Sequence, residues 1–241
     1  MRLDNVKVVS FSGIDGAGKS TQIKALQHHL QQLGLRANLY TFWDDIVVFA
    51  GLREHLSFRA FKGDKGIGRP DKPISRRDKN VTSWYVIAIR LFFYLLDAYS
   101  LRMAVRGSCD VGGDFIIFDR YIYDELANLP LSSRLIRLYV RLLLHLIPRP
   151  DIAFIVDADP EVAHIRKPEY PLEFVRKNRD SYIALSRLVR GMKILPPVSL
   201  EEITAKIKQT ISEVLPHPDV EPADLQLQCA GGIAPSKTPN L

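Results

Sequence analysis

A glycine-rich segment near the N-terminus constrains the fold of this chain more than any other feature. Residues 13–20 read Gly-Ile-Asp-Gly-Ala-Gly-Lys-Ser and fit the pattern GxxxxGK[ST]. The segment follows a short β-branched apolar run at 6–11, which predicts a strand, and it leads into residues 19–33, whose apolar side chains recur with helical spacing. A strand, a glycine turn and a helix in this order are the local structure that a phosphate-binding loop requires.

The residue types of this loop suit the binding of a triphosphate. Glycines let the backbone curl so that successive N–H groups face inward, where they and the positive end of the helix dipole bind phosphate oxygens. We predict that Lys19 reaches the β- and γ-phosphates, that the Ser20 hydroxyl ligates magnesium, and that Thr21 donates to the α-phosphate. The predicted nucleotide-binding residues are Gly13, Asp15, Gly16, Ala17, Gly18, Lys19, Ser20 and Thr21.

Strands and helices alternate along the rest of the chain. Continuous apolar runs predict further strands at 36–43, 114–119, 151–157 and 192–195, and helical patterns lie between them at 81–105, 131–147, 172–190 and 200–215. Because strands without polar alternation are buried on both faces, we expect a parallel sheet of about five strands with helices on both faces. With the loop, this pattern predicts the three-layer α/β fold of P-loop NTPases.

An acidic residue ends the predicted strand 114–119, and an arginine follows it directly. In parallel α/β sheets, ligands bind at the carboxyl ends of the strands. We therefore expect Asp119 to contact magnesium directly or through water, and Arg120 to neutralise charge on a transferring phosphoryl group. The alternatives are a helix-capping role for Asp119 and a surface ion pair for Arg120.

The composition favours one domain with an insertion and a tail. The chain has 241 residues, and we predict a single P-loop domain at 1–215. Residues 51–80 are rich in Gly, Pro and charge, and within them 53–80 holds nine Lys or Arg residues against four acids, which predicts either a site for an anionic partner or a solvated basic loop. Residues 216–241 are rich in proline and lack periodicity, so we predict a disordered C-terminal tail.

Several classes of protein are disfavoured by the sequence. Cys109 and Cys229 form no metal-binding spacing, and so few thiols fit a reducing, cytoplasmic compartment. The N-terminal residues lack the layout of a secretion signal. The most apolar run, 84–101, contains Arg90 and Asp97, so we expect a buried helix and no membrane span.

The motifs resemble those of the thymidylate kinase family of nucleoside monophosphate kinases. Residues 11–21 are very close to the family's N-terminal signature, residues 118–121 (Phe-Asp-Arg-Tyr) look like its Asp-Arg-Tyr motif, and residues 150–163 look like its next block. The likeness covers roughly 1–43, 83–129 and 148–215. It implies an enzyme that uses ATP and Mg²⁺ to phosphorylate a phosphate-bearing small molecule, a nucleoside monophosphate. It also implies a possible homodimer, because many members of the family are dimers.

The resemblance implies roles for individual residues. Lys19 and the loop amides hold ATP, Asp15 lies near the sugar of the acceptor or the metal, and Arg120 bridges the acceptor phosphate. Where residue 16 is Gly, the family supplies cations from a lid, which here is short and spans about 164–172. Arg166 and Lys167 occupy that place, with Arg176 and Arg179 further on. The predicted catalytic residues are Lys19, Arg120, Asp15 and Arg166, and the predicted metal ligands are Ser20 and Asp119.

The acceptor half of the site departs from the family pattern. Where the family has Arg-Glu-Pro after the second strand, this chain has residues 43–45, Trp-Asp-Asp, and the family's Asp-Arg pair in the long helix is Asp97-Ala98. The positions of a family Ser and of its Tyr-Gln pair hold Asp124, Asn128 and Leu129. Arginines of the basic segment 53–80 are candidates to replace those that are missing: Arg53, Arg69, Arg76 and Arg77.

Two other functions remain open from the sequence. The acceptor can be a hydroxyl compound, either a deoxynucleoside or a non-nucleotide metabolite or glycan, with Asp44 or Asp45 as the base. The chain can also be a nucleotide-dependent binding module, since the segment 134–147 and the segment 53–80 are both basic. Membrane and nucleic acid are the less favoured partners, and the basic helix is expected to pack against a partner subunit or to present a solvated face.

Overall fold

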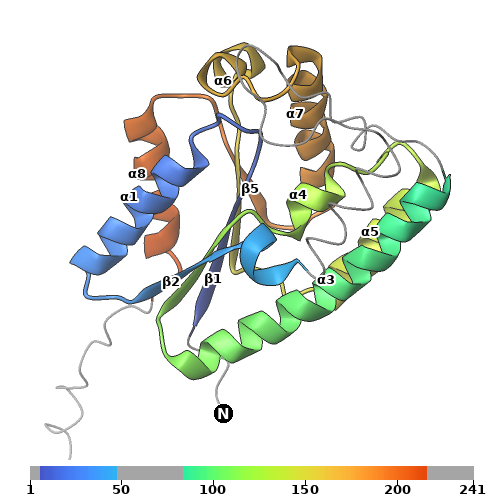
Figure 1. Ribbon diagram of the computed structural model, residues 1–241. Coiled ribbons are helices and arrows are strands. Elements are labelled where there is room, and N and C mark those ends of the chain that lie inside the picture. The colour runs from blue at the N-terminus through green and yellow to red at the C-terminus, as the bar shows by residue number, and fades with distance from the viewer. Residues whose placement is uncertain (1–5, 48–83, 216–241) are drawn as a thin grey trace, which may run out of the picture.

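Figure 1 shows the protein as a computed structural model, which describes residues 6–47 and 84–215. The predicted basic loop at 51–80, the four arginines proposed there and the predicted tail at 216–241 lie outside the described residues.

Five parallel strands form one sheet in the order β2-β3-β1-β4-β5. Their bounds are Lys7–Ser12 for β1, Ala37–Thr41 for β2, Phe115–Asp119 for β3, Ile152–Val156 for β4 and Met192–Leu195 for β5. β1, β3 and β4 are buried along almost their whole length, so these strands read as continuous apolar runs and not as alternating ones. The predicted α/β fold class with a five-stranded parallel sheet is confirmed.

Helices cover both faces of the sheet. α1 and α8 lie side by side on one face, and α3, α4, α5 and α7 lie on the other, while α6 stands above the carboxyl ends of the strands (Figure 1). The bounds are Lys19–Gln32 for α1, Trp84–Val111 for α3, Ile122–Leu126 for α4, Arg134–Leu146 for α5, Pro160–Arg166 for α6, Leu172–Ser186 for α7 and Leu200–Ser212 for α8. Asp159 caps the start of α6, because its side chain accepts from the N–H groups of Glu161 and Val162.

The second strand is shorter than predicted. β2 ends at Thr41, and the next five residues, Phe42–Ile46, form a single π-helical turn, η2. The side chain of Asp45 accepts a hydrogen bond from the Thr41 N–H at 2.6 Å, and this local contact competes with continuation of the strand.

The order of the strands places the glycine-rich loop at the point where ligands bind in such sheets. β1 is the central strand, with β3 and β2 on one side and β4 and β5 on the other. The loop after β1 therefore lies where the strand order reverses. The register aligns Asp119 with both Phe11 and Thr41, so the end of β3, the loop after β1 and the start of η2 share one edge of the sheet.

The expectation that the apolar run 84–101 is a buried helix was wrong. α3 buries one side, with Tyr94, Asp97, Ala98 and Leu101 inside, but it exposes Phe92 and Tyr99. The helix lies at the edge of the domain (Figure 1), and among the described elements it packs against η2, α4 and α5. Within the described part of the chain, no helix is long and apolar enough to cross a membrane.

Candidate nucleotide-binding site

The glycines of the loop are required by close contacts with two other elements. Gly13 and Gly16 have φ values of 139° and 85°, which are rarely adopted by other residues. A Cβ atom at Gly13 would lie 2.4 Å from the carbonyl oxygen of Val156 on β4, and one at Gly16 would lie 2.3 Å from that of Ala163 on α6. The loop thus follows a path that places its backbone directly against β4 and α6.

The side chain of Lys19 bonds to the backbone of the loop that precedes it. Its Nζ donates to the carbonyl oxygens of Gly13 at 2.7 Å and Ile14 at 2.9 Å, and its side chain is buried. Burial, and secondarily the neighbouring charge of Arg120, lowers the pKa of Lys19 to about 8. The loop therefore carries a buried cation that lacks a full compensating charge.

The first turn of α1 has the donors that a phosphate group needs. The amides of Gly18, Lys19 and Ser20 have no acceptor among the described residues, and they precede or begin a helix of 14 residues. Ser20 and Thr21 are exposed at the same turn. Unpaired amides beside a buried lysine match a phosphate chain in both charge and hydrogen-bonding capacity.

Arg120 has a strained backbone and two carboxylate partners. Its φ is 68°, a left-handed conformation that costs roughly 1–2 kcal/mol for a residue with a side chain. Its N–H donates to the carbonyl oxygen of Phe11 at 3.0 Å, which fixes the residue beside β1. Its Nη2 forms an ion pair with Asp15 of the loop, and its Nη1 lies 3.5 Å from Oδ1 of Asp124.

These carboxylates keep Arg120 charged. Burial of the guanidinium opposes its charge, but Asp124 and then Asp15 outweigh this effect, and together they raise the pKa of Arg120 above its usual value. Arg120 is consequently a permanent cation at the carboxyl edge of the sheet.

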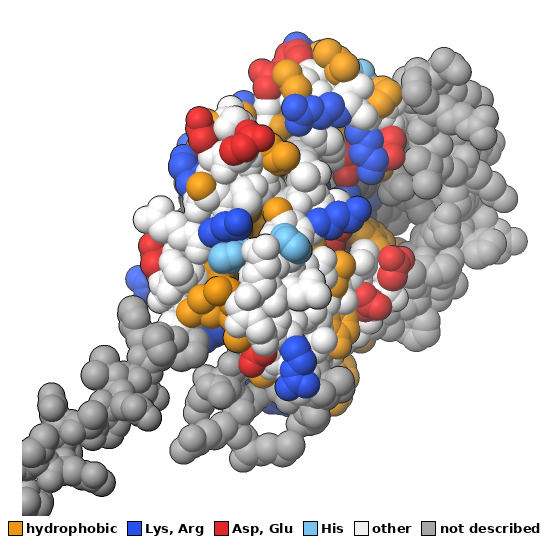
Figure 2. Space-filling model, turned by 90° about the vertical axis from the view of Figure 1, so that its left-hand side faces the viewer, with side chains coloured by type: hydrophobic (Ala, Val, Ile, Leu, Met, Phe, Trp, Pro, Cys, Tyr) orange, Lys and Arg blue, Asp and Glu red, His pale blue; other side chains and the backbone are white. Residues whose placement is uncertain are grey.

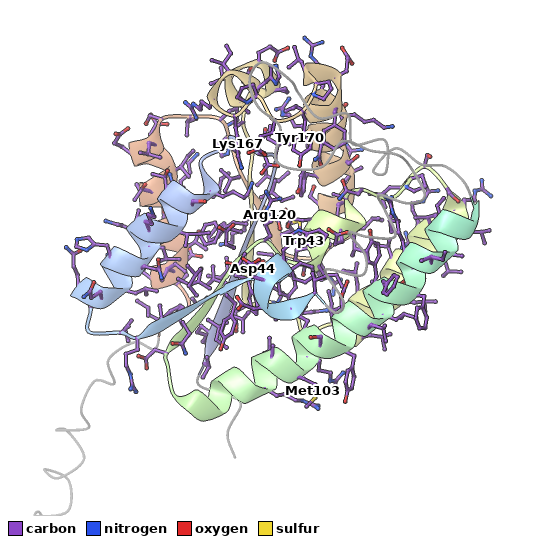
Figure 3. All side chains as sticks on the ribbon, in the orientation of Figure 1. Trp43, Asp44, Met103, Arg120, Lys167 and Tyr170 are labelled. Atoms are coloured by element: carbon purple, nitrogen blue, oxygen red, sulfur yellow. The ribbon has the colours of Figure 1, made fainter. Side chains whose placement is uncertain are left out.

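The lid reaches the same loop through Asp15. Lys167 follows the last residue of α6, and its Nζ lies 3.9 Å from Oδ1 of Asp15 and 3.2 Å from Oε1 of Glu169. Figure 3 shows Arg120 between Lys167 and Tyr170 on the lid side and Trp43 and Asp44 on the side of η2. Asp15 therefore connects Arg120, which follows β3, to Lys167, which follows α6.

The other basic residues predicted near the lid are placed differently. Arg166 lies exposed at the end of α6 and has no ion-pair partner in the described ranges 6–47 and 84–215. Arg176 pairs with Glu161 at 2.6 Å and with Glu173 at 2.9 Å, and Arg179 forms a two-pronged pair with Asp157 at 2.6 and 2.7 Å. Of these four described cations, Lys167 is the one that forms an ion pair with a residue of the loop.

Two of the predicted site residues can contribute to magnesium binding. Asp119 ends β3 in register with Phe11, one residue before Ser12 and the loop, and Ser20 lies on the exposed first turn of α1. The described residues include no group of three or more His, Cys, Asp or Glu side chains that can hold a metal by themselves. This sparse set fits Mg²⁺, which commonly takes one or two protein oxygens together with phosphate oxygens and water.

Asp124 is a site residue whose role the sequence did not reveal. In the comparison with the family pattern, Asp124 stands out only as a departure from a serine. In the structure its carboxylate is buried beside Arg120. The available signal was an acid four positions after Arg120, a spacing that brings two side chains together on a helix.

Comparisons with known proteins agree with this geometry. No family model matches the sequence. The chain is 29% identical over 184 residues to a thymidylate kinase of Chlorobaculum parvum, covering 72% of each chain. It is 28% identical over 215 residues to a probable thymidylate kinase of Pyrobaculum aerophilum, covering 86% of this chain and 97% of that one. The chain is thymidylate kinase-like.

A solved structure extends the comparison to the fold of this thymidylate kinase-like chain. The crystal structure of a thymidylate kinase from Ehrlichia chaffeensis superposes with a TM-score of 0.55 at 18% identity, covering 86% of this chain and 99% of that one. At this identity the likeness shows the fold alone, which is that of the P-loop NTPases. The two relatives confirm the predicted family resemblance and the predicted class of enzyme, an ATP-dependent kinase.

Proposed function

We propose that this thymidylate kinase-like chain uses ATP and Mg²⁺ to phosphorylate a nucleoside monophosphate. The observation that carries the proposal is the ion pair between Arg120, which directly follows β3, and Asp15 of the loop. It holds a permanent cation beside the phosphate-binding loop, where a second phosphate group needs one. The two relatives that are named thymidylate kinases support the same acceptor class.

The donor half of the site binds ATP through the loop. The amides of Gly18, Lys19 and Ser20 donate to phosphate oxygens, and the Nζ of Lys19 exchanges its contacts with backbone carbonyl oxygens for contacts with the β- and γ-phosphates. Ser20 and Asp119 hold Mg²⁺, which neutralises charge on the phosphate chain when it is bound.

The acceptor half of the site aligns the nucleophile. An oxygen of the acceptor phosphate takes the place of the Asp15 carboxylate on Nη2 of Arg120. This oxygen then forms a bond to the γ-phosphorus while the bond from that phosphorus to the β,γ-bridging oxygen breaks, so ADP leaves. Because phosphate oxygens are already nucleophilic, the chain has only to position the groups and stabilise charge, through Lys19, Arg120 and a lid cation.

A panel of acceptors tests the proposal. Purified protein is incubated with ATP and Mg²⁺ and with each of the common nucleoside and deoxynucleoside monophosphates, and ADP release is measured. We expect transfer to at least one monophosphate, loss of transfer in Lys19→Ala, and no loss in Lys24→Ala, an exposed lysine on the same helix. Transfer to none of the monophosphates would overturn the proposed acceptor class.

A hydroxyl acceptor is the second candidate, and Asp44 is the observation that favours it. Asp45 is occupied by its bond to the Thr41 N–H, whereas Asp44 on η2 is exposed and has no partner in the described part of the chain. Both Asp44 and Arg120 follow the aligned ends of β2 and β3, and Figure 3 shows them in the same region of the molecule. A carboxylate there can accept the proton of a hydroxyl nucleophile.

The same panel separates the two candidates when deoxynucleosides and free sugars are added to it. If a hydroxyl compound is the acceptor, Asp44→Asn abolishes transfer to it and Asp45→Asn leaves transfer largely intact. If a monophosphate is the acceptor, Asp44→Asn has little effect on the rate.

We also propose that the chain forms a homodimer through α3 and α5. The two helices pack together, and the Tyr139 hydroxyl on α5 donates to the carbonyl oxygen of Leu91 on α3 at 2.5 Å. Together they expose nine large apolar side chains at helical spacing, Ile89, Phe92, Leu95, Tyr99 and Met103 on α3 and Leu135, Leu138, Leu142 and Leu146 on α5, a set that we call the apolar stripe.

The extent of the apolar stripe favours a second copy as its partner. Single exposed leucines are ordinary, but a contiguous set along two helices marks an interaction surface. A second copy related by a two-fold axis covers the stripe with the same nine residues. The face formed by α1 and α8 differs, because charged side chains of both signs are interspersed with apolar ones there (Figure 2).

A further inference from the structure

The short helix α4 holds a buried carboxylate that the reaction described above does not use. Asp124 is 3% exposed, and both of its oxygens are engaged. Oδ2 accepts from the Ser12 hydroxyl at 2.6 Å and from the Tyr121 N–H at 3.1 Å. Oδ1 accepts from the Tyr182 hydroxyl at 2.7 Å and faces Nη1 of Arg120 at 3.5 Å.

The partners of Asp124 come from the elements that build the site. Ser12 is the last residue of β1 and directly precedes the phosphate-binding loop. Arg120 directly follows β3, and Tyr182 lies on α7, the helix that follows the lid. One carboxylate therefore joins the loop strand, the acceptor-side cation and the lid helix.

The hydrogen bonds make this carboxylate a fixed feature of the site. A buried carboxylate is costly unless donors satisfy it, and removal of one partner of a buried charge pair leaves the other uncompensated. Burial first, and then the charge of Asp124, raises the pKa of Tyr182 well above its usual value, so the phenol keeps its proton and stays a donor. Asp124 is thus held by three uncharged donors in addition to Arg120.

The two carboxylates on Arg120 differ in how readily they can be replaced. The side chain of Asp15 is 16% exposed and is shared with Lys167, whereas that of Asp124 is 4% exposed and enclosed by its donors. An incoming anion can therefore displace Asp15 from Nη2 more readily than it can displace Asp124 from Nη1.

We propose that Asp124 is a positioning residue that holds the Nη1 edge of Arg120 and so directs the Nη2 edge to the acceptor phosphate. This inference rests on the proposed function for the identity of the acceptor. It also deepens that function, because Arg120 then offers a single edge and binds the acceptor phosphate through one nitrogen.

Nitrogen NMR of the arginine side chains tests the positioning without any acceptor. The Arg120 guanidinium signal is assigned with Arg120→Lys, and its Nη groups are expected to rotate slowly in the unaltered protein because two carboxylates hold them. In Asp124→Asn we expect averaged Nη signals. Asp114→Asn is the control, since Asp114 accepts from the Arg36 N–H at 2.8 Å near the amino end of β3, far from Arg120.

Kinetics supply the second readout. For Asp124→Asn we expect a fall of about 10²-fold in kcat/KM for the acceptor, since misplacement of a positioned group by about 1 Å costs that much. The affinity for a non-hydrolysable ATP analogue should be unchanged, because Lys19 and the loop amides remain. Tyr182→Phe removes one donor to Asp124 and keeps the carboxylate, so it should lower kcat/KM for the acceptor by a smaller factor. This variant replaces Asp124→Asn in the test if Asp124→Asn does not fold.

Two results would overturn the inference. One is an Arg120 signal and an acceptor KM that do not change in folded Asp124→Asn or Tyr182→Phe protein. The other is a parallel loss of ATP-analogue affinity, which indicates a purely structural role. If Asp124→Asn averages the Nη signals but the unaltered protein transfers phosphate to no monophosphate, then the proposed function fails and the positioning of Arg120 by Asp124 stands.

Discussion

The carbonyl oxygen of Ala163 lies where a side chain at Gly16 would begin. An added Cβ would lie 2.3 Å from that oxygen and 3.1 Å from the Cα of Ala163, both of which belong to the backbone of α6. The phosphate-binding loop and the helix before the lid are therefore in backbone contact. No side chain at residue 16 can reach the phosphates unless α6 moves, so any cation that joins Lys19 there comes from another element.

Gly16→Ala tests this contact. We expect the affinity for an ATP analogue to fall by more than tenfold, because the change combines a left-handed residue, at roughly 1–2 kcal/mol, with a steric overlap that displaces α6 or the loop. Isothermal titration calorimetry measures the affinity.

Gly34→Ala is the matched control. Gly34 has a φ of 74°, but a Cβ atom there meets nothing within 4 Å. This variant should lower the melting temperature through backbone strain alone and leave the affinity for the analogue unchanged. Equal binding losses in both variants would show that the contact with Ala163 is unimportant.

Arg166 and Lys167, the two adjacent cations of the predicted lid, can be compared by substituting each in turn. Lys167 lies 3.9 Å from Asp15, whereas Arg166 is exposed. We expect Lys167→Ala to lower kcat by roughly 10³-fold, as loss of a cation that stabilises the transferring phosphoryl group does. Arg166→Ala should lower kcat by less than threefold, and single-turnover rates at saturating ATP measure both. A larger loss in Arg166→Ala would show that Arg166, the residue predicted from the family resemblance, supplies the cation after the lid closes.

The parts of this protein that local sequence determines were predictable. The loop Gly13–Ser20 and the buried strands each follow from residues adjacent in the chain, and the structure has the strands within about two residues of the predicted bounds. η2 and α4 were missed because five residues are too few to show a helical period. The role of Asp124 was missed because Ser12 and Tyr182 are 112 and 58 positions away, and only the tertiary fold brings them together.

The pH dependence of ATP binding should report the state of Lys19. Burial lowers its pKa to about 8, so in the free protein Lys19 loses its proton as the pH rises through 8. A bound triphosphate favours the charged form, so the affinity for an ATP analogue should decrease as the pH rises above 8, with uptake of a proton on binding. Calorimetry in buffers of different ionisation enthalpy measures that proton.

Lys19 should also affect the stability of the free protein. Its folded-state pKa is depressed below the unfolded value of 10.5, so between about pH 8 and 10.5 the unfolded chain binds more protons than the folded one. Lys19 therefore makes the free energy of unfolding rise with pH across this window. Lys19→Ala should lack both this slope and the pH dependence of analogue binding. An unchanged pH profile in Lys19→Ala would assign the titration to another group.

The apolar stripe predicts the oligomeric state. If a second copy covers it, the unaltered protein should sediment with a mass near twice the 27.3 kDa of the chain. Leu138→Arg places a charge within the stripe, on a side chain that is 55% exposed in the single chain, and burying that charge against a second copy is unfavourable. We therefore expect it to give monomers with an unchanged melting profile at low concentration. Leu33→Arg, a side chain of similar exposure at the end of α1, should leave the mass unchanged. A monomeric unaltered protein that sediments with anionic vesicles would instead assign the stripe to a lipid surface.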